Sequence, residues 1–160
     1  MHVGIGYDIH RLRPGKKLTL GGVEIPCRYC LEGHSDADVL LHAIMDALLG
    51  AAALRDIGSH FPPDDPAFKG ASSILLLQDV RSKIEKRGFI VGNVDSTVIA
   101  EEPRIAPFVD AMRERIASAI GANSMQVMVK ATTNEGLDAI GAKKAIAALA
   151  VAILLKREES

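Results

Sequence analysis

The sequence predicts an α+β fold in which helices are layered on one face of a mixed β-sheet. Strand-like and helix-like segments follow one another in the order β-ββ-α-α-β-α-β-α. No repeat, linker or low-complexity tract divides the chain, and 160 residues are enough to bury one hydrophobic core. We therefore expect a single domain at residues 1–160.

The first third of the chain predicts a strand, a hairpin and a helix. Residues 2–10 alternate between apolar and small or polar side chains, which is typical of a strand. Residues 18–20 and 23–25 flank a Gly-Gly pair and indicate a hairpin. Ser35 or Asp36 can cap a helix that runs to about Gly50. The apolar face of the first strand consists of Val3, Ile5, Tyr7 and Ile9.

The remainder predicts a long loop followed by helices and strands in alternation. Residues 57–71 are rich in Pro and Gly, and a loop of this length suggests a functional lid. Ser72 or Ser73 can cap a helix that ends before Gly88. The segments that follow predict a strand at 89–100, a helix at 103–120 ended by Gly121, and a strand at 125–131. The last segment, 143–156, is apolar nearly all round and predicts a buried final helix.

Composition narrows the class of function. The net charge of −1 provides no field that would attract nucleic acid or a membrane surface, and aromatic residues at 4% leave little for base stacking. The N-terminus shows no signal or transit pattern, and the longest apolar run is too short to span a bilayer, so we expect a cytoplasmic location. Cys27 and Cys30 form a lone C-x-x-C, which we interpret as two reduced thiols near a turn.

A first candidate site lies on the opening strand. Asp8 and His10 are two residues apart and therefore share one strand face. On that face they follow Gly4 and Gly6, which leave room for a ligand or for another backbone. A carboxylate beside an imidazole suits a divalent metal, but it also occurs as an ordinary hydrogen-bonded pair.

A second candidate lies on the helix that follows. Asp38, His42 and Asp46 are spaced four residues apart and form one polar stripe, in which the two carboxylates could fix the tautomer of the imidazole. Asp8, His10 and His42 together would leave one open position on a tetrahedral zinc, which is the pattern of a catalytic site. The alternative is a polar stripe with a purely structural role.

Two further segments could bind a substrate. Residues 130–136, K-A-T-T-N-E-G, offer two hydroxyl groups, backbone amides and a carboxylate, which suit a phosphate with a hard cation. Without Walker spacing, the same residues could be a Thr-rich turn. Carboxylates at 56–65 could bind the hydroxyl groups of a polyol or could simply keep a surface loop soluble.

Taken together, these segments resemble the 2-C-methyl-D-erythritol 2,4-cyclodiphosphate synthase family over nearly the whole chain. The motifs that carry the resemblance are G-I-G-Y-D-I-H at 4–10, H-S-D-A-D-V-L-L-H-A-I-M-D-A-L-L-G-A at 34–51, D-I-G at 56–58, F-P at 61–62, D-P-A-F-K-G-A at 65–71, G-N-V-D at 92–95 and V-K-A-T-T-N-E at 129–135.

The resemblance implies a lyase of non-mevalonate isoprenoid biosynthesis. It would convert 4-diphosphocytidyl-2-C-methyl-D-erythritol 2-phosphate to 2-C-methyl-D-erythritol 2,4-cyclodiphosphate and CMP, by metal-assisted intramolecular attack of a phosphate. It also implies a homotrimer with active sites between neighbouring subunits.

The resemblance also implies roles for individual residues. Asp8, His10 and His42 match zinc ligands, and Glu135 matches a ligand of a second divalent cation, Mg²⁺ or Mn²⁺. Groups that stabilise the transition state correspond to His34 and Thr133. The methylerythritol moiety and its phosphates would contact Ser35, Asp56, Ile57, Gly58, Phe61, Pro62, Pro63, Asp64 and Asp65. The cytidine pocket would consist of residues 100–106, in particular Ala100, Pro103, Arg104, Ile105 and Ala106, together with Ala131 and Thr132, and Asn134 would also contact the substrate.

Two positions depart from the family pattern. Ala37 replaces a common glycine within the predicted helix, where alanine favours helix formation. Pro63-Asp64 replaces a more usual Asp-Thr or Asp-Asn pair, so the acidic contact of the loop is expected at Asp64 or Asp65.

The residues alone leave two other functions open. One is a zinc hydrolase that cleaves nucleotide diphosphates with water, which would release an open rather than a cyclic diphosphate. The other is a non-catalytic trimeric binding module, which would hold no stoichiometric zinc. The family resemblance favours the synthase.

Overall fold

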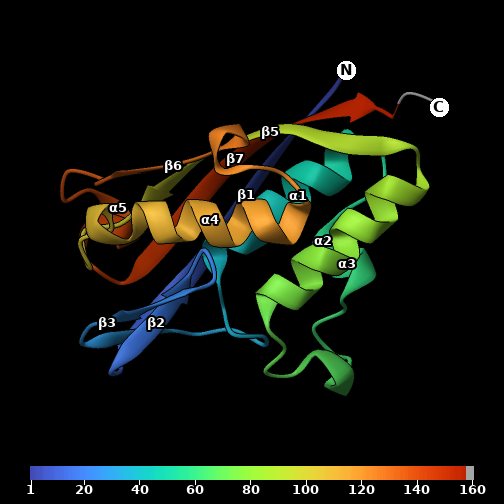
Figure 1. Cartoon of the computed structure of the whole chain (residues 1–160). Helices are drawn as coiled ribbons and strands as arrows, with labels where there is room; N and C mark the ends of the chain where they lie inside the picture. The colour runs from blue at the N-terminus through green and yellow to red at the C-terminus, as the bar shows by residue number, and fades with distance from the viewer. Residues whose placement is uncertain (158–160) are drawn as a thin grey trace.

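A five-stranded mixed sheet runs through the centre of this computed structural model, which describes residues 1–157 (Figure 1). The strand order is β4-β1-β7-β5-β6, and neighbouring strands are antiparallel except for the β5–β6 pair. The strands of this sheet are β1 (His2–Pro14), β4 (Tyr29–Leu31), β5 (Phe89–Ile99), β6 (Val127–Thr132) and β7 (Ala145–Lys156).

Three helices cover one face of this sheet (Figure 1): α1 (Val39–Ala51), α3 (Ser73–Lys86) and α4 (Val109–Ile120). The buried core lies between these helices and the sheet. The predicted α+β class, with helices layered on one face of a mixed sheet, is therefore confirmed. None of the helices within residues 1–157 combines the length and apolar character needed to cross a membrane.

Shorter elements connect these layers. A separate hairpin consists of β2 (Lys17–Leu20) and β3 (Val23–Pro26), as predicted. The predicted 57–71 loop contains two short helical turns, α2 (Ile57–His60) and η1 (Pro66–Phe68). The remaining short elements are η2 (Ala106–Phe108), η3 (Ser124–Gln126) and α5 (Asp138–Gly141).

Most predicted elements are confirmed, and their boundaries shift by a few residues. Ser72 is the N-cap residue of α3, and Gly121 ends α4 in the left-handed conformation, φ 69°. β1 extends to Pro14, and β4 is an additional short strand that contains Cys30. Pro103 lies before α4, which it was predicted to begin. Cys27 and Cys30 are both free thiols.

The predicted final helix is wrong, because residues 145–156 form the central strand β7. β7 is hydrogen-bonded to β1 on one side and to β5 on the other. A strand buried in the middle of a sheet can be apolar throughout, so an apolar run does not distinguish it from a buried helix. Alternation was nevertheless present in the sequence, because small residues at Ala148, Ala150 and Ala152 alternate with Leu149 and Val151. The alanines are buried, while Leu149 and Val151 lie on the exposed face.

Two glycines of β1 bring α1 close to the sheet. A Cβ atom added at Gly4 would lie 2.0 Å from the carbonyl oxygen of Ala47, and one added at Gly6 would lie 1.9 Å from that of Ala43. The open space expected beside Gly4 and Gly6 is therefore filled by the backbone of α1 and not by a ligand. This close approach places His42 of α1 over the end of the Asp8–His10 face.

The start of α1 also differs from the prediction. The N-cap residue is Asp38, whose side chain accepts a hydrogen bond from the N–H of Leu41, and not Ser35 or Asp36. Ala37 lies before the helix with φ 57°, in the left-handed region that favours glycine. The prediction that alanine is favourable here because it lies within the helix is therefore wrong.

Candidate active site

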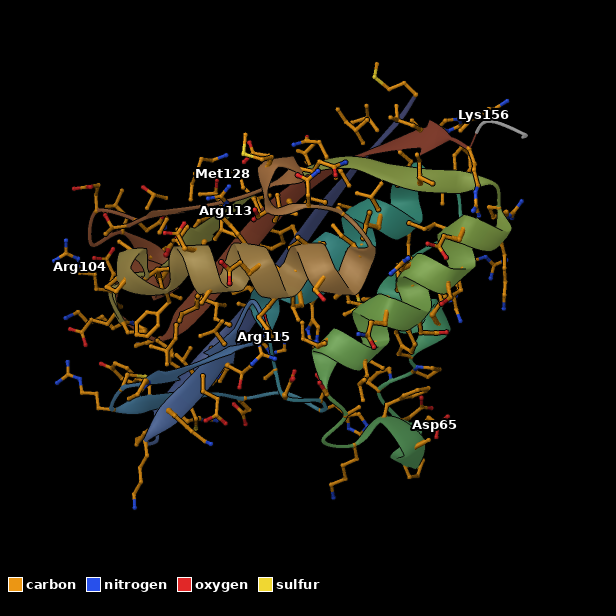
Figure 2. The ribbon with its side chains drawn as sticks, viewed as in Figure 1. Asp65, Arg104, Arg113, Arg115, Met128 and Lys156 are labelled. Carbon is orange, nitrogen blue, oxygen red and sulfur yellow. The ribbon has the colours of Figure 1, made fainter. Side chains whose placement is uncertain are left out.

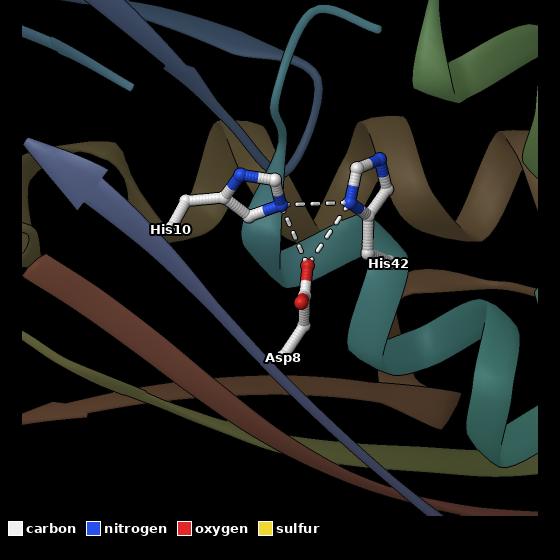
Figure 3. Close-up of side chains that lie close together, drawn as sticks. All are labelled: Asp8, His10 and His42. Carbon is white, nitrogen blue, oxygen red and sulfur yellow. Dashed lines mark hydrogen bonds and ion pairs between the residues drawn. The ribbon is translucent and has the colours of Figure 1, made fainter. Parts of the chain in front are cut away.

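Asp8, His10 and His42 converge as predicted, although they come from β1 and α1 (Figure 3). The Asp8 Oδ2 atom lies 2.8 Å from His10 Nε2 and 3.0 Å from His42 Nδ1. The two ring nitrogens are 3.1 Å apart, and one donor atom from each residue lies within 4.8 Å of the others. A carboxylate and two imidazoles in this arrangement can bind a divalent cation.

The electrostatics of this cluster favour an ionised Asp8 with a positively charged partner beside it. Burial alone would raise the pKa of the Asp8 carboxyl, but hydrogen bonds and charges from His10 and His42 lower it well below its usual range. Burial would lower the pKa of His10, yet its hydrogen bonds to Asp8 and to the Glu32 carbonyl raise it above its ordinary value. Asp8 is therefore ionised, and protons or a metal cation compete for the same nitrogen and oxygen atoms.

Each imidazole directs one nitrogen into the cluster and the other away from it. His10 Nδ1 donates to the Glu32 carbonyl oxygen at 2.7 Å, which leaves Nε2 facing Asp8. His42 directs Nδ1 at Asp8, and its Nε2 lies 3.1 Å from the hydroxyl groups of both Ser35 and Ser73. Ser73 was not among the predicted site residues, and its sequence position suggested only a helix cap.

The structure corrects the predicted role of Asp38. Its fully buried carboxylate does not hydrogen-bond to the His42 imidazole. Instead it accepts three backbone N–H groups, from Gly21 and Gly22 of the hairpin turn and from Leu41 at the start of α1. Asp38 therefore fastens the β2–β3 hairpin to the helix that carries His42.

Asp46 likewise has a different partner from the one predicted. Its Oδ1 accepts the backbone N–H of Ile57 at 2.7 Å, which attaches the 56–58 segment to α1. Asp56 caps the next turn by accepting both the N–H and the hydroxyl of Ser59. These carboxylates hold the segment that was predicted to bind a polyol.

A pocket of about 260 Å³ lies beside the cluster. Its walls combine His10 and His42 with residues of the 57–71 loop, and Phe61 packs edge-on against Phe68 with ring centroids 5.4 Å apart. His34 lies in the same pocket and its Nε2 is 3.2 Å from the carbonyl oxygen of Asp65. The pocket thus gathers the predicted residues His34, Ser35, Ile57, Gly58, Phe61 and Pro63, together with Phe68 and Leu76, which were not predicted.

A second pocket, of about 220 Å³, lies where β5 and β6 end. Its lining contains most of the residues predicted for cytidine: Ala100, Pro103, Arg104, Ile105, Ala106, Ala131 and Thr132. Thr133 also lines it and donates a hydrogen bond to Glu135 at 3.0 Å. Glu101, which lies within the predicted 100–106 stretch, also lines the pocket; it accepts the N–H groups of Asn134 and Gly136 and so holds the 133–136 loop.

The two pockets lie far apart within one chain. Figure 2 shows Asp65, beside the first pocket, and Arg104, in the second, at opposite ends of the molecule. A single chain therefore does not bring the two sets of predicted substrate contacts together.

Comparisons with known proteins cover nearly the whole chain. The YgbB family model matches residues 1–155. The 2-C-methyl-D-erythritol 2,4-cyclodiphosphate synthase of Moorella thermoacetica is 58% identical over 99% of this chain and 97% of its own. That of Symbiobacterium thermophilum is 56% identical over 98% and 100%. Among solved structures, IspF of Plasmodium falciparum in complex with CDP has a TM-score of 0.86 and 36% identity, covering 98% of this chain and 97% of that one. The bifunctional IspDF of Campylobacter jejuni has a TM-score of 0.93 and 39% identity, covering 99% and 42%.

Proposed function

Because this chain belongs to the YgbB family, together with curated 2-C-methyl-D-erythritol 2,4-cyclodiphosphate synthases, we propose that its two pockets bind opposite ends of one substrate. The chain is a cyclodiphosphate-forming enzyme of the non-mevalonate isoprenoid pathway. Its substrate is 4-diphosphocytidyl-2-C-methyl-D-erythritol 2-phosphate, and the second product is CMP. The pocket beside Asp8, His10 and His42 takes the methylerythritol and phosphate end, and the pocket near Ala100 and Thr132 takes the cytidine.

The Asp8, His10 and His42 cluster holds zinc in this proposal. The donor set supports it, because one carboxylate oxygen and two imidazole nitrogens lie 2.8–3.1 Å from one another, and three such ligands would suit a catalytic zinc. Glu135, with Thr133 beside it, holds the second cation, Mg²⁺ or Mn²⁺, since hard cations prefer oxygen ligands. When bound, the two cations neutralise the charge that develops on the phosphates.

The side chains orient the reacting groups and need not form a covalent intermediate. An oxygen of the 2-phosphate forms a bond to the β-phosphorus, and the bond from that phosphorus to the bridging oxygen of CMP breaks. His34 and Thr133 lie in the two pockets, one in each, and stabilise the charge in the transition state. Ile57, Gly58 and Phe61 exclude water from the phosphate end, which favours intramolecular attack over hydrolysis.

The remaining predicted contacts are part of the same proposal. Pro62, Asp64 and Asp65 continue the 57–71 loop around the methylerythritol moiety, and Asp56 offers its carboxylate to a hydroxyl group. Asn134 stands between Thr133 and Glu135 in the loop that approaches the diphosphate.

The chain assembles as a homotrimer in this proposal, as the family resemblance implies. The support now comes from the uncovered face of the sheet, where large apolar side chains are exposed in the isolated chain; Ile5, for example, is 71% exposed. The exposed apolar residues of this face include Val3, Ile5, Tyr7 and Ile9 of β1 and Leu149 and Val151 of β7. Neighbouring subunits against this face would bury it, and an active site shared between subunits would combine the first pocket of one subunit with the second pocket of another.

The observation that carries the proposal is the convergence of Asp8, His10 and His42 beside a pocket in a chain of this family. The test is incubation of the purified protein with the cytidine-linked substrate, followed by analysis of both products. CMP and a cyclic diphosphate in equal amounts are expected, whereas an open diphosphate would identify a hydrolase. His42→Ala should lose most of the bound zinc and the activity while the assembly stays folded, and full zinc content in that variant would contradict the metal site.

A further inference from the structure

We propose that Asp36 and Ser73 form a hydrogen-bonded relay that fixes the tautomer of His42, so that its Nδ1 lone pair faces Asp8 and His10. Both are positioning residues, because they act on the metal site through the imidazole. The proposal rests on the zinc site described above, and it replaces the role that the sequence suggested for Asp38 and Asp46.

The geometry of the relay is well defined. Ser73 is fully buried at the first residue of α3, and its hydroxyl oxygen lies 3.1 Å from His42 Nε2. The same hydroxyl donates to Asp36 Oδ1 at 2.5 Å, and the Ser73 N–H donates to Asp36 Oδ2 at 2.9 Å. The Asp36 carboxylate therefore accepts hydrogen bonds from both the hydroxyl and the backbone N–H of Ser73.

The direction of these hydrogen bonds decides the tautomer. An ionised carboxylate has no proton, so it can only accept, and the single hydroxyl proton of Ser73 must point at Asp36. The Ser73 oxygen then has only lone pairs to offer to His42 Nε2, which must donate. Where a cation takes the place of the His42–Asp8 hydrogen bond, a neutral imidazole with its proton on Nε2 offers the lone pair of Nδ1, the atom 3.0 Å from Asp8 Oδ2, as a ligand.

The hydroxyl of Ser35 does not by itself fix the tautomer of His42. Its hydroxyl oxygen is also 3.1 Å from His42 Nε2, and it accepts the N–H of Ala37 at 3.3 Å. That contact leaves the hydroxyl proton of Ser35 able to point toward or away from the imidazole. The Ser73 hydroxyl lacks this freedom, because its proton points at Asp36. The Asp36 carboxylate therefore determines which His42 nitrogen carries the proton.

The test compares three variants of the full-length protein for zinc affinity, by competition with a chelator. Ser73→Ala removes the acceptor, and we expect about tenfold weaker zinc binding, at the lower end of the ~10–100-fold typical of such outer partners, because Ser35 remains. Asp36→Asn should weaken it similarly, because an amide has one acceptor oxygen where the carboxylate has two. The N–H and the hydroxyl of Ser73 then compete for that oxygen, and the hydroxyl proton is free to turn toward His42 Nε2. Ser72→Ala is the matched control, since Ser72 is exposed and its side chain makes no cap hydrogen bond.

A spectroscopic readout separates orientation from general stability. In zinc-loaded protein labelled with ¹⁵N-histidine, the Nε2–H signal of His42, assigned with His42→Ala, should exchange slowly with water in the wild type and in Ser72→Ala. It should exchange rapidly or disappear in Ser73→Ala. If Ser73→Ala does not fold, Asp36→Asn decides by the same two measurements.

The relay is overturned if the zinc affinity and the Nε2–H exchange of Ser73→Ala, or of Asp36→Asn where that variant decides, match those of the Ser72→Ala control. A wild-type protein that binds no zinc would instead contradict the proposed metal site. The two failures are therefore distinguishable.

Discussion

Gly6→Ala tests whether the close contact between β1 and α1 positions the metal site. The new Cβ would lie 1.9 Å from the Ala43 carbonyl oxygen and 2.8 Å from the Ala47 nitrogen, whereas ordinary contacts begin at 3.4 Å. Both obstacles are backbone atoms that cannot rotate away, so α1 must move outward by about 1.5 Å. Overpacking of this kind costs roughly 1–3 kcal/mol, and we expect about 3 kcal/mol because the clash is with backbone.

The same displacement should damage metal binding. His42 precedes Ala43 on α1, so moving the helix lengthens the 3.0 Å contact between His42 Nδ1 and Asp8 Oδ2. A misplacement of about 1 Å can cost on the order of 100-fold in activity, and we expect at least a comparable loss of zinc affinity.

Two assays measure these effects. Urea unfolding of metal-free protein at one fixed protein concentration gives the free energy of unfolding, and chelator competition gives the zinc affinity. Gly50→Ala is the control, because nothing lies within 4 Å of its new Cβ and alanine should stabilise α1 by up to about 1 kcal/mol. Gly6→Ala with stability within about 0.5 kcal/mol of the wild type and unchanged zinc affinity would refute this reasoning.

Three further outcomes are expected. Asp38→Ala should lower the free energy of unfolding by about 3 kcal/mol, because three backbone N–H groups lose their acceptor, and Asp38→Asn by about half as much; losses below 1 kcal/mol in urea titrations would contradict this. Glu135→Gln should keep zinc but need much more Mg²⁺ or Mn²⁺ for activity, and an unchanged metal-dependence curve would count against the second cation site. Ile5→Glu should convert a species of about 51 kDa, three times 17.1 kDa, to smaller species in light scattering, whereas Leu75→Glu on the exposed side of α3 should not; a monomeric wild type would contradict the trimer.

Within the metal cluster, the Asp8–His10 pair was predictable from strand periodicity, whereas the expectation that His42 joins them rested mainly on the family resemblance. Asp8 and His10 are two residues apart on a strand, and residues with this spacing share a face in any strand. The partners of His42 were not predictable in the same way. The stripe of Asp38 and Asp46 satisfies helix periodicity, but the backbone N–H groups of other segments claim both carboxylates. Which groups meet across elements depends on packing, and helical spacing alone does not specify it.

The two pockets likewise combine residues that sequence motifs identified with residues that only the packing of the chain brings in. Motifs along the sequence identified most of the residues that line them, and the structure gathers these residues into one hollow beside α1 and another where β5 and β6 end. Phe68 and Leu76 were missed because each lies in a segment whose local pattern predicts only packing or solvent exposure. Their neighbours in space come from other parts of the chain.

The sequence by itself determined the class of the fold, the hairpin, the capped helix α3 and the strand face that carries Asp8 and His10. These features follow from periods, caps and turn residues that act over a few positions. Only the tertiary structure decided the state of residues 145–156, whose alanines and leucines favour a helix locally. Between β1 and β5, the same residues satisfy their backbone hydrogen bonds on both sides, and the small alanines let α1 pack closely above them. This pairing outweighs the local helix propensity. It involves strands that are far apart in the sequence, so the local sequence does not reveal it.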